Sequence, residues 1–307
     1  MVARIKDAVT CALGEPPDQE LWIGDDAAVV APPAGWLVLA TDAAVAGVHA
    51  DLSLVGIDDL GWKAVTAAVS DLGAMGARPR QALVTLCLPA GSDVDALNAG
   101  VVAAAVAYGC PVVGGDLSSA DQLMVSVAVV GSVDAGPPPV RRAGASPGET
   151  ILVTGPLGRS AAGLRCLRQR RPAAPASAVT GLVAAHRRPV ARLAEGEVAR
   201  LAGATAMIDV SDGLAIDLDR LARASGVGVR LGGVPVGDGA TLDEALGGGE
   251  DYELVVVTPD PDGLVDALGG AGLRPPAVIG RCTEDPGERT LAGRSLARSG
   301  WEHPLGC

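Results

Sequence analysis

The chain has 307 residues and a formal net charge of −12, from 36 acidic and 24 basic side chains, and it contains no Phe. Its length predicts two compact domains or one large one. Its acidic balance argues against a nucleic-acid-binding protein, which normally has a basic face. Only Lys6 and Lys63 are lysines and neither follows a glycine, so the chain has no P-loop. Without Phe it also lacks the Asp-Phe-Gly motif of protein kinases.

The first half of the chain alternates strand-like and helix-like patterns. Short apolar runs predict three strands, at residues 36–41, 81–88 and 123–133. Longer stretches predict two helices, at 58–75 and 92–108. A proline-rich segment at 135–139 follows, and it is stiff and has few side chains to bury, as is typical of a linker.

We therefore divide the chain into two domains, residues 1–140 and 141–307. The second domain again alternates short apolar runs with helical patterns, and two of its helices lie on either side of Pro189. Such alternation in both halves predicts an α/β or α+β architecture, with mixed sheets flanked by helices.

Cysteine and hydropathy patterns bear on the compartment. Six Cys occur without a Cys-x-x-Cys pair, which argues against a zinc or disulfide framework and for reduced thiols. No stretch reaches the roughly 20 apolar residues that a membrane span needs, and the N-terminal apolar run is too weak for a signal peptide. We expect a cytoplasmic protein that does not enter a membrane.

Seven aspartates stand beside Gly, Ser or Ala at predicted element ends: Asp25, Asp26, Asp42, Asp71, Asp116, Asp209 and Asp212. Asp71 is the most informative, because Ala64, Ala68 and Asp71 share one face of the predicted helix, so a carboxylate continues the inward-facing side. An unpaired buried carboxylate costs several kcal/mol, on the order of 3–5. Mg²⁺, which is held by carboxylates and substrate phosphates, would compensate these charges. Turns and helix caps explain single aspartates, but not Asp71 or the Asp25–Asp26 pair.

Glycine-rich strings could supply backbone donors to phosphate. Gly114 and Gly115 precede Asp116 and allow close approach of the backbone. The string Ser211-Asp212-Gly213 opens a predicted helix, whose N-terminus favours anions. For the string at 155–163, a packing role and a phosphate contact remain equally open.

Eight motifs follow one another between residue 23 and about residue 303. They are Gly-Asp-Asp-Ala-Ala at 24–28, Thr-Asp-x-x-Val-x-Gly-Val-His at 41–49, Ser-Asp-Leu-x-Ala-Met-Gly-Ala at 70–77, Gly-Gly-Asp at 114–116, Arg-x-Gly-Ala-x-Pro-Gly at 142–148, Val-Thr-Gly-x-Leu-Gly-x-Ser-Ala-Ala-Gly-Leu at 153–164, Ile-Asp-x-Ser-Asp-Gly-Leu at 208–214 and Gly-Gly-Glu-Asp-Tyr-Glu-Leu at 248–254. In this order they resemble the thiamine-monophosphate kinase family of the aminoimidazole-ribonucleotide synthetase superfamily.

The resemblance implies the two-domain fold of that superfamily and ATP-dependent phosphorylation of thiamine monophosphate to thiamine diphosphate. It implies an N-terminal domain that binds metal and ATP and pairs in a homodimer, with the nucleotide site close to that interface, and a C-terminal domain that completes the active site. It implies several Mg²⁺ ions, held by Asp26, Thr41, Asp42, Asp71, Asp116, Asp209 and Asp212. It places ATP at Gly115, Asp116, Arg142 and Ser211, and the thiamine phosphate at His49, Glu250 and Trp301. No protein base is expected, because the attacking phosphate oxygen is already ionised.

The chain departs from the family at Ala50, Ala68, Leu117 and Gly247, which bear on the fit of the pockets and leave the aspartates intact. Three alternatives stay open. A hydrogenase-maturation relative would use a C-terminal Cys, and Cys307 is present but follows Pro304-Leu305-Gly306. A selenophosphate synthetase would need a reactive Cys with a nearby Lys, and the context of Cys11 does not match. A non-catalytic metal–nucleotide-binding protein would not need the whole aspartate set.

Overall fold

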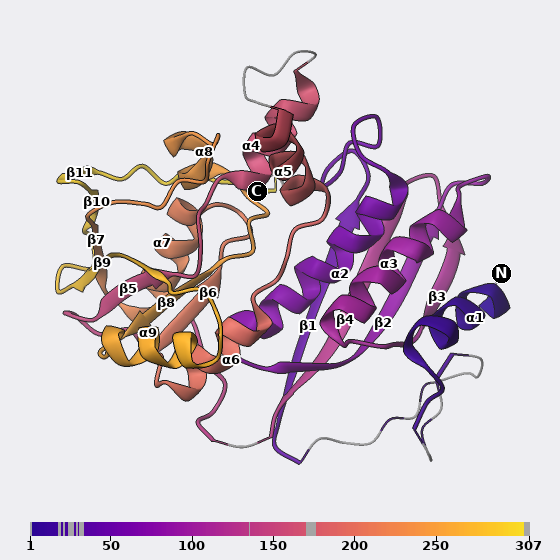
Figure 1. Ribbon diagram of the computed structural model, residues 1–307, viewed down its shortest axis with the longest axis horizontal. Helices are drawn as coiled ribbons and strands as arrows, with labels where there is room; N and C mark the ends of the chain where they lie inside the picture. Colours follow the sequence, from indigo (N-terminus) through magenta and orange to yellow (C-terminus); the bar gives the residue numbers. More distant parts are fainter. Residues whose placement is uncertain are drawn as a thin grey trace. The chain divides into compact units, whose positions relative to one another are not determined.

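The structure is a computed structural model that describes residues 2–17, 20, 22–23, 28, 30, 34–134, 136–169 and 176–303 (Figure 1). The chain forms two compact units, Met1–Leu72 with Arg78–Ala135, and Gly73–Ala77 with Gly136–Cys307. Each unit has a mixed sheet flanked by helices, which confirms the α/β prediction. Within the described part of the chain, every helix is too short or too polar to cross a membrane.

The first unit is built on a four-stranded sheet in the order β1-β4-β2-β3. The strands are β1 (Trp36–Val45), β2 (Arg78–Leu88), β3 (Val112–Ser119) and β4 (Met124–Val133). β4 is antiparallel to β1 and β2, whereas β2 and β3 are parallel. The helices are α1 (Val2–Leu13), α2 (Ile57–Ala74) and α3 (Val94–Tyr108), and α2 and α3 lie across one face of the sheet (Figure 1).

The two faces of this sheet differ. Val84, Val127 and Val129 are buried on the face that the helices cover. On the other face Leu37, Leu39 and Leu83 are 51%, 66% and 44% exposed. Leucine is among the residues most often buried in proteins, so a sheet face that exposes three of them is a candidate for an interaction surface.

The second unit has a seven-stranded sheet in the order β11-β10-β7-β9-β5-β8-β6. The strands are β5 (Thr150–Val153), β6 (Ala206–Asp209), β7 (Gly228–Leu231), β8 (Leu254–Thr258), β9 (Ala277–Thr283), β10 (Arg289–Leu291) and β11 (Arg294–Ser295). The helices are α4 (Arg159–Arg168), α5 (Ala176–Arg187), α6 (Leu193–Leu201), α7 (Leu214–Ser225), α8 (Leu242–Gly247) and α9 (Pro261–Gly270). The pairs are antiparallel except β7 with β10.

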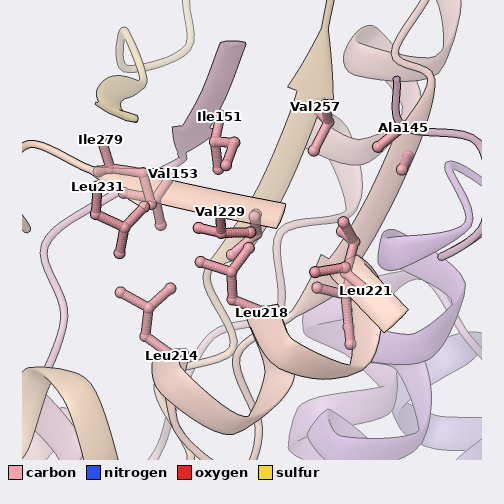
Figure 2. Close-up of a cluster of buried hydrophobic side chains, with 14 of the residues drawn as sticks. Ala145, Ile151, Val153, Leu214, Leu218, Leu221, Val229, Leu231, Val257 and Ile279 are labelled. Atoms are coloured by element: carbon pink, nitrogen blue, oxygen red, sulfur yellow. The ribbon is translucent and has the colours of Figure 1, made fainter. Parts of the chain in front are cut away.

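Helices cover both faces of this second sheet. On one face Leu214, Leu218 and Leu221 of α7 pack toward strand residues such as Val153 and Val229 (Figure 2). On the other face a separate core joins residues of α6 and α9 to Leu152, Met207 and Val256. Burial on both faces explains why β5, β6 and β8 read in the sequence as continuous apolar runs rather than as alternating ones.

The sequence predictions held for α2, α3 and the strongly apolar strands, and they missed several strands with weaker apolar patterns. The helix predicted at 58–75 is α2, at Ile57–Ala74. The strands β3, β7, β9, β10 and β11 were not predicted, because they are short or interrupted by Gly and polar residues. Asp42 and Asp116 consequently lie inside β1 and β3 and not at element ends, which corrects the sequence analysis.

Two glycines let α2 and α3 pack closely in the first unit. A Cβ atom on Gly100 would overlap the carbonyl oxygen of Asp58, and one on Gly61 would overlap the carbonyl oxygen of Leu97.

Gly100→Ala is therefore expected to lower the free energy of unfolding by about 1–3 kcal/mol through overpacking, measured by urea denaturation. The control Gly181→Ala lies on α5 with nothing within 4 Å of the added carbon, and it should stabilise the protein by about 0.5–1 kcal/mol. Equal effects of the two substitutions would contradict this account.

Candidate active site

The first unit carries almost all of the negative charge of the chain. Its two segments contain 16 acidic and 5 basic residues, a net charge of −11, whereas the second unit has 20 acidic and 19 basic residues, a net charge of −1. Self-repulsion of this size destabilises the compact state, and bound cations would reduce it. The unit that holds most of the predicted Mg²⁺ ligands is thus the one whose charge bound cations would neutralise.

The predicted ligands of the first unit lie on both edge strands of its sheet. Asp42 on β1 is opposite Val127 on β4, and Val127 is opposite Val84 on β2. Val84 is in turn opposite Gly115 on β3, next to Asp116. Three strand spacings, about 14 Å, therefore separate Asp42 from the Gly115–Asp116 position across the sheet.

The same register places these side chains on different faces. Asp42 shares its cross-strand row with Val127 and Val84, which are buried under the helices. Asp116 is opposite Thr85, and its row lies on the open face, as does that of Thr41. Since Mg²⁺ ligands lie about 2.1 Å from the ion, Asp42 and Asp116 of one chain do not share an ion in this arrangement.

Asp71 lies in the last turn of α2, where the helix dipole is unfavourable to a carboxylate. It is half-buried, next to the fully buried Ser70. No basic residue occupies that last turn. A bound cation would remove both the dipole penalty and the desolvation penalty of this side chain.

His49 follows β1 and has a fixed ring. Its Nδ1 accepts a hydrogen bond from the Val45 amide at 2.9 Å. An accepting Nδ1 leaves the proton on Nε2, so the neutral imidazole offers one donor. Asp26, the remaining predicted ligand of this unit, lies outside the described residues.

In the second unit the 208–214 motif forms the end of β6 and the loop before α7. Asp209 is the buried last residue of β6. The amides of Ser211, Asp212 and Gly213 all donate to Oδ2 of Asp217, at 3.1, 2.9 and 3.1 Å. The sequence predicted that this helix N-terminus would favour phosphate, but an internal carboxylate already occupies its amides. Burial raises the pKa of Asp217 to about 6.

Arg220 ties the carboxylates of this loop together. Its Nη1 donates to Asp212 Oδ2 at 2.5 Å and to Asp217 Oδ1 at 2.6 Å. The guanidinium thereby holds Asp212 in place through one carboxylate oxygen. Asp212 could therefore bind a metal as a carboxylate whose orientation is already fixed by a hydrogen bond.

The 248–254 motif runs alongside the 208–214 motif. The Glu250 amide donates to the Ser211 carbonyl at 2.8 Å, and the Tyr252 amide donates to the Val210 carbonyl at 2.9 Å. Glu250 and Tyr252 have φ angles of 65° and 50°, which are strained for residues other than glycine. Such strain is concentrated at functional sites and persists only where the surroundings enforce it.

The side chains of Glu250 and Asp251 fix this strained segment. Glu250 Oε2 lies 3.6 Å from Nδ1 of the buried His186, and the same nitrogen lies 3.1 Å from Ser160 Oγ. Asp251 accepts from the amides of Gly158 and Ser160, at 2.5 and 3.1 Å. Burial raises the pKa of Asp251 to about 6. The contacts of Asp251 favour the packing role of the 155–163 string, because two of its amides bind protein.

Of the other two predicted contact residues of this unit, only Trp301 lies beside the same loop. The carbonyl of Arg142 accepts from Ser225 Oγ at the opposite end of α7, and the Arg142 side chain is exposed. The Trp301 amide donates to the Asp212 carbonyl at 2.9 Å. The second unit therefore brings Ser211, Asp212, Glu250 and Trp301 together through backbone contacts. His186, Ser160 and Arg220 join them without having been singled out in the sequence, since only the fold brings them near.

The donor set fits Mg²⁺ bound together with phosphate. Among the described residues no three His, Cys, Asp or Glu side chains gather into a metal cage. The predicted ligands are hard oxygen atoms of Asp and Thr, and Mg²⁺ typically takes one or two carboxylates, waters and substrate phosphate oxygens. The residues therefore fit a Mg²⁺ ion whose coordination shell is completed by the phosphate oxygens of a substrate.

Comparison with known proteins identifies the relatives of the chain. Residues 24–133 match the family described as AIR synthase related protein, N-terminal domain, and residues 146–292 match its C-terminal domain. A thiamine-monophosphate kinase of Salmonella typhimurium is 36% identical over 300 residues, covering 92% of this chain and 89% of the relative. The solved thiamine-monophosphate kinase of Stenotrophomonas maltophilia superposes with a TM-score of 0.82 at 32% identity, covering 96% of each chain.

A second solved structure, of a protein named AaThiL in complex with AMPPCP and TMP, has a TM-score of 0.77 at 31% identity and covers 97% of this chain and 96% of its own. The Escherichia coli hydrogenase maturation protein HypE is 21% identical with a TM-score of 0.75, covering 96% and 97%. At that identity the likeness shows a shared fold only.

One network in the 248–254 motif supports the fold of the second unit. Buried Glu253 binds Arg192 through two hydrogen bonds, of 3.0 and 2.7 Å, and accepts from Thr154 Oγ1 at 2.6 Å. Glu253→Gln is expected to lower the free energy of unfolding by about 3 kcal/mol, because the Arg192 guanidinium loses its nearest carboxylate and keeps the more distant Glu195, at 3.8 Å. The control Arg274→Gln removes only the peripheral 3.3 Å contact of an exposed side chain and should cost less than about 1 kcal/mol. Chemical denaturation measures both, and a harmless Glu253→Gln would refute the role of the network.

Proposed function

We propose that this chain transfers the terminal phosphoryl group of ATP to thiamine monophosphate, because it belongs to the thiamine-monophosphate kinase family. The observation that carries the proposal is the similarity of this chain to thiamine-monophosphate kinases over about nine-tenths of its length. One of the similar solved structures is a complex with AMPPCP and TMP. The products are thiamine diphosphate and ADP. The HypE likeness, confined to the fold, gives no comparable support to the alternative, and Cys307 lies outside the described residues.

The chain binds and orients two anionic substrates. The attacking atom is an oxygen of the substrate phosphate, which is ionised at neutral pH, so no protein base has to remove a proton. Asp26, Thr41, Asp42, Asp71, Asp116, Asp209 and Asp212 would hold Mg²⁺. Bound Mg²⁺ supplies charge neutralisation between the attacking and leaving oxygens. The ATP contacts fall on Gly115, Asp116, Arg142 and Ser211.

The residues around Glu250 bind the organic part of the substrate. The thiazolium ring of thiamine is cationic, and the Glu250 carboxylate is a suitable partner for it. The position of this carboxylate is set in part by His186, whose Nδ1 lies 3.6 Å from Glu250 Oε2. His49 of the first unit, whose Nδ1 accepts from the Val45 amide, carries its proton on Nε2, and an N–H group is the kind of donor that a phosphate binds. A substrate with a cationic ring and an anionic phosphate needs both an acceptor carboxylate and a hydrogen-bond donor.

The activity is tested with the purified protein, both substrates and Mg²⁺, followed by chromatography of the thiamine esters. Thiamine diphosphate should form in step with ADP and only when Mg²⁺ is present. Release of ADP without thiamine diphosphate would overturn the assignment.

Asp71→Asn should lower turnover by a factor of about 10²–10³, because an uncharged amide neither neutralises nor holds Mg²⁺ as a carboxylate does. Circular dichroism should show an unchanged fold. The control Asp243→Asn, on the exposed side of α8, should keep normal turnover. Wild-type activity in Asp71→Asn would remove this residue from the metal site.

A second copy of the chain would cover the open face of the first unit. Leu37, Leu39 and Leu83 lie on that face, and β1 and β3 leave their edges free for pairing among the described strands. Two such four-stranded sheets, closed edge to edge, give an eight-stranded barrel whose interior side chains can fill. The homodimer is thus supported by an apolar face and by the two edges it would bury.

The same closure would complete the metal site. Thr41 and Asp116 share the open face of the sheet but lie on opposite edge strands, three strand spacings or about 14 Å apart across the sheet of one chain. Pairing of β1 with the β3 of the second copy would bring Thr41 of one chain toward Asp116 of the other on the enclosed face, whereas Asp42 would stay on the face that the helices cover. Each active site would then combine residues of both copies, and Mg²⁺ would compensate the −11 charge of each first unit at the interface.

Mixing two inactive variants tests this arrangement. Thr41→Val and Asp116→Asn should each abolish activity alone, because every site lacks one ligand. After mixing and subunit exchange, half of the dimers are mixed and have one intact site, so activity should return to about a quarter of the wild-type value. The control mixture of Thr41→Val with Thr41→Ala should stay inactive. Mixed dimers with no recovered activity would show that both ligands serve the same chain.

A further inference from the structure

The start of α7 gathers three carboxylates around the guanidinium of Arg220. The negative charges of Asp209 and Asp212 both act on the carboxylate of Asp217, which is buried, as is Asp209. Arg220 binds Asp212 and Asp217 directly. One guanidinium among three carboxylates leaves the group negative overall, so the charge of Arg220 has a large effect on any cation that approaches.

Arg220 holds two of these carboxylates through a single nitrogen. Its Nη1 lies 2.5 Å from Asp212 Oδ2 and 2.6 Å from Asp217 Oδ1. A small rotation of the guanidinium can therefore break one contact and keep the other. The side chain of Arg220 is 33% exposed, which gives it room to turn toward solvent.

The two carboxylates that Arg220 binds differ in their access to solvent. The side chain of Asp217 is 1% exposed, and its Oδ2 already accepts from the amides of residues 211–213. The side chain of Asp212 is 29% exposed. A cation from solvent can thus reach Asp212, whereas Asp217 stays a fixed partner for Arg220.

The main chain of Asp212 is held independently of Arg220. Its amide donates to Asp217 Oδ2, and its carbonyl accepts from the Trp301 amide, each at 2.9 Å. Arg220 therefore acts on the Asp212 carboxylate itself, which it both orients and neutralises. Orientation favours metal binding, whereas neutralisation disfavours it. A short side chain on a fixed main chain has little freedom left to lose, so the charge effect is the larger one.

We propose that the Arg220 guanidinium takes the place of a metal ion on Asp212 when no metal is bound, and that it releases Asp212 and stays on Asp217 when a divalent cation binds. The inference rests on the proposed function in one point, that Asp212 is a Mg²⁺ ligand. Binding at Asp212 is then an exchange of cations, because a guanidinium and a divalent cation on one carboxylate repel each other. The exchange keeps the loop neutralised without metal and lowers its affinity for a free ion.

This arrangement distinguishes the second unit from the first. Asp71 has no basic residue in its own turn of α2, whereas Asp212 has a guanidinium of its own chain in contact. A free ion at Asp212 has to displace that guanidinium. An ion that arrives with nucleotide phosphates brings further oxygen ligands with it, so Arg220 favours the metal–nucleotide complex over the free metal.

Arg220→Gln tests the exchange, with Mn²⁺ as the probe and paramagnetic resonance of the free ion as the measurement on the metal-free full chain. The variant should bind Mn²⁺ about tenfold more tightly at one site, because the competing cation is gone. Arg220→Lys, which retains the charge, should stay within about threefold of the wild type. The tightening should disappear in the Asp212→Asn background, because competitor and metal act on the same carboxylate.

Arg223→Gln is the matched control, since it removes the same charge from the same helix. Arg223 is 72% exposed and binds Asp219 at 2.8 Å. Its loss should change the Mn²⁺ affinity by less than about twofold, because solvent screens an exposed charge. Equal tightening in Arg220→Gln and Arg223→Gln would overturn the inference, because the net charge of the unit would then be the cause.

Thermal unfolding with and without Mn²⁺ decides the question even if Arg220→Gln folds poorly. The variant should have a lower melting temperature than the wild type without metal, and saturating Mn²⁺ should recover most of the loss. An equal loss with and without Mn²⁺ would show that Arg220 has a purely structural role. An unfolded variant that Mn²⁺ does not restore would have the same meaning.

The outcomes separate this inference from the proposed function. A wild type that forms no thiamine diphosphate, while the Mn²⁺ affinities change as expected, overturns the proposed function alone. An active wild type that loses a Mn²⁺ site in Asp212→Asn, but whose Arg220→Gln variant binds Mn²⁺ no more tightly, overturns the inference alone. Unchanged Mn²⁺ binding in Asp212→Asn removes Asp212 from the ligands and overturns the inference with it.

Discussion

The concentration of negative charge in the first unit is the constraint on which the rest of the structure depends. A net charge of −11 on this unit, against −1 on the second, cannot be relieved by its own five basic residues. Asp71 sharpens the problem, because it stands at the negative end of a helix dipole. Bound cations would resolve it, and the proposed phosphoryl transfer needs cations at the same place. Under this proposal, the charge that looks unsuitable for binding phosphate is the means of binding it through metal.

The second unit treats its acids differently. Asp217, Asp219, Asp251 and Glu253 are each held by backbone amides or arginines. These internal pairs fix the two motif segments, which then bond to each other through Ser211, Glu250 and the neighbouring backbone. Strain at Glu250 and Tyr252 persists because the surrounding contacts enforce it. The first unit therefore concentrates unneutralised negative charge, whereas the second unit pairs its buried acids internally.

The sequence predicted much of this arrangement, and its errors have a common cause. The α/β class, the helix that carries Asp71 and the motif segments followed from local patterns. The positions of Asp42 and Asp116 within strands did not, since a Gly-rich strand such as β3 has no strand signal of its own and forms by pairing with β2. The amides of Ser211 to Gly213 were expected to face phosphate, but Asp217, one helical turn further, reaches them first.

By itself, the sequence determined the chemistry: oxygen ligands without a P-loop, an ordered set of eight motifs, and a charge that calls for metal. Residue types and their local spacing suffice for these conclusions, because ligand hardness and backbone propensity are properties of short segments. Only the tertiary structure decided that Asp42 and Asp116 lie on opposite edges and opposite faces of one sheet, and that Asp217 and Arg220 hold the Asp212 loop. Strand register and contacts between distant segments decide these points, and a one-residue change in register would reverse the faces.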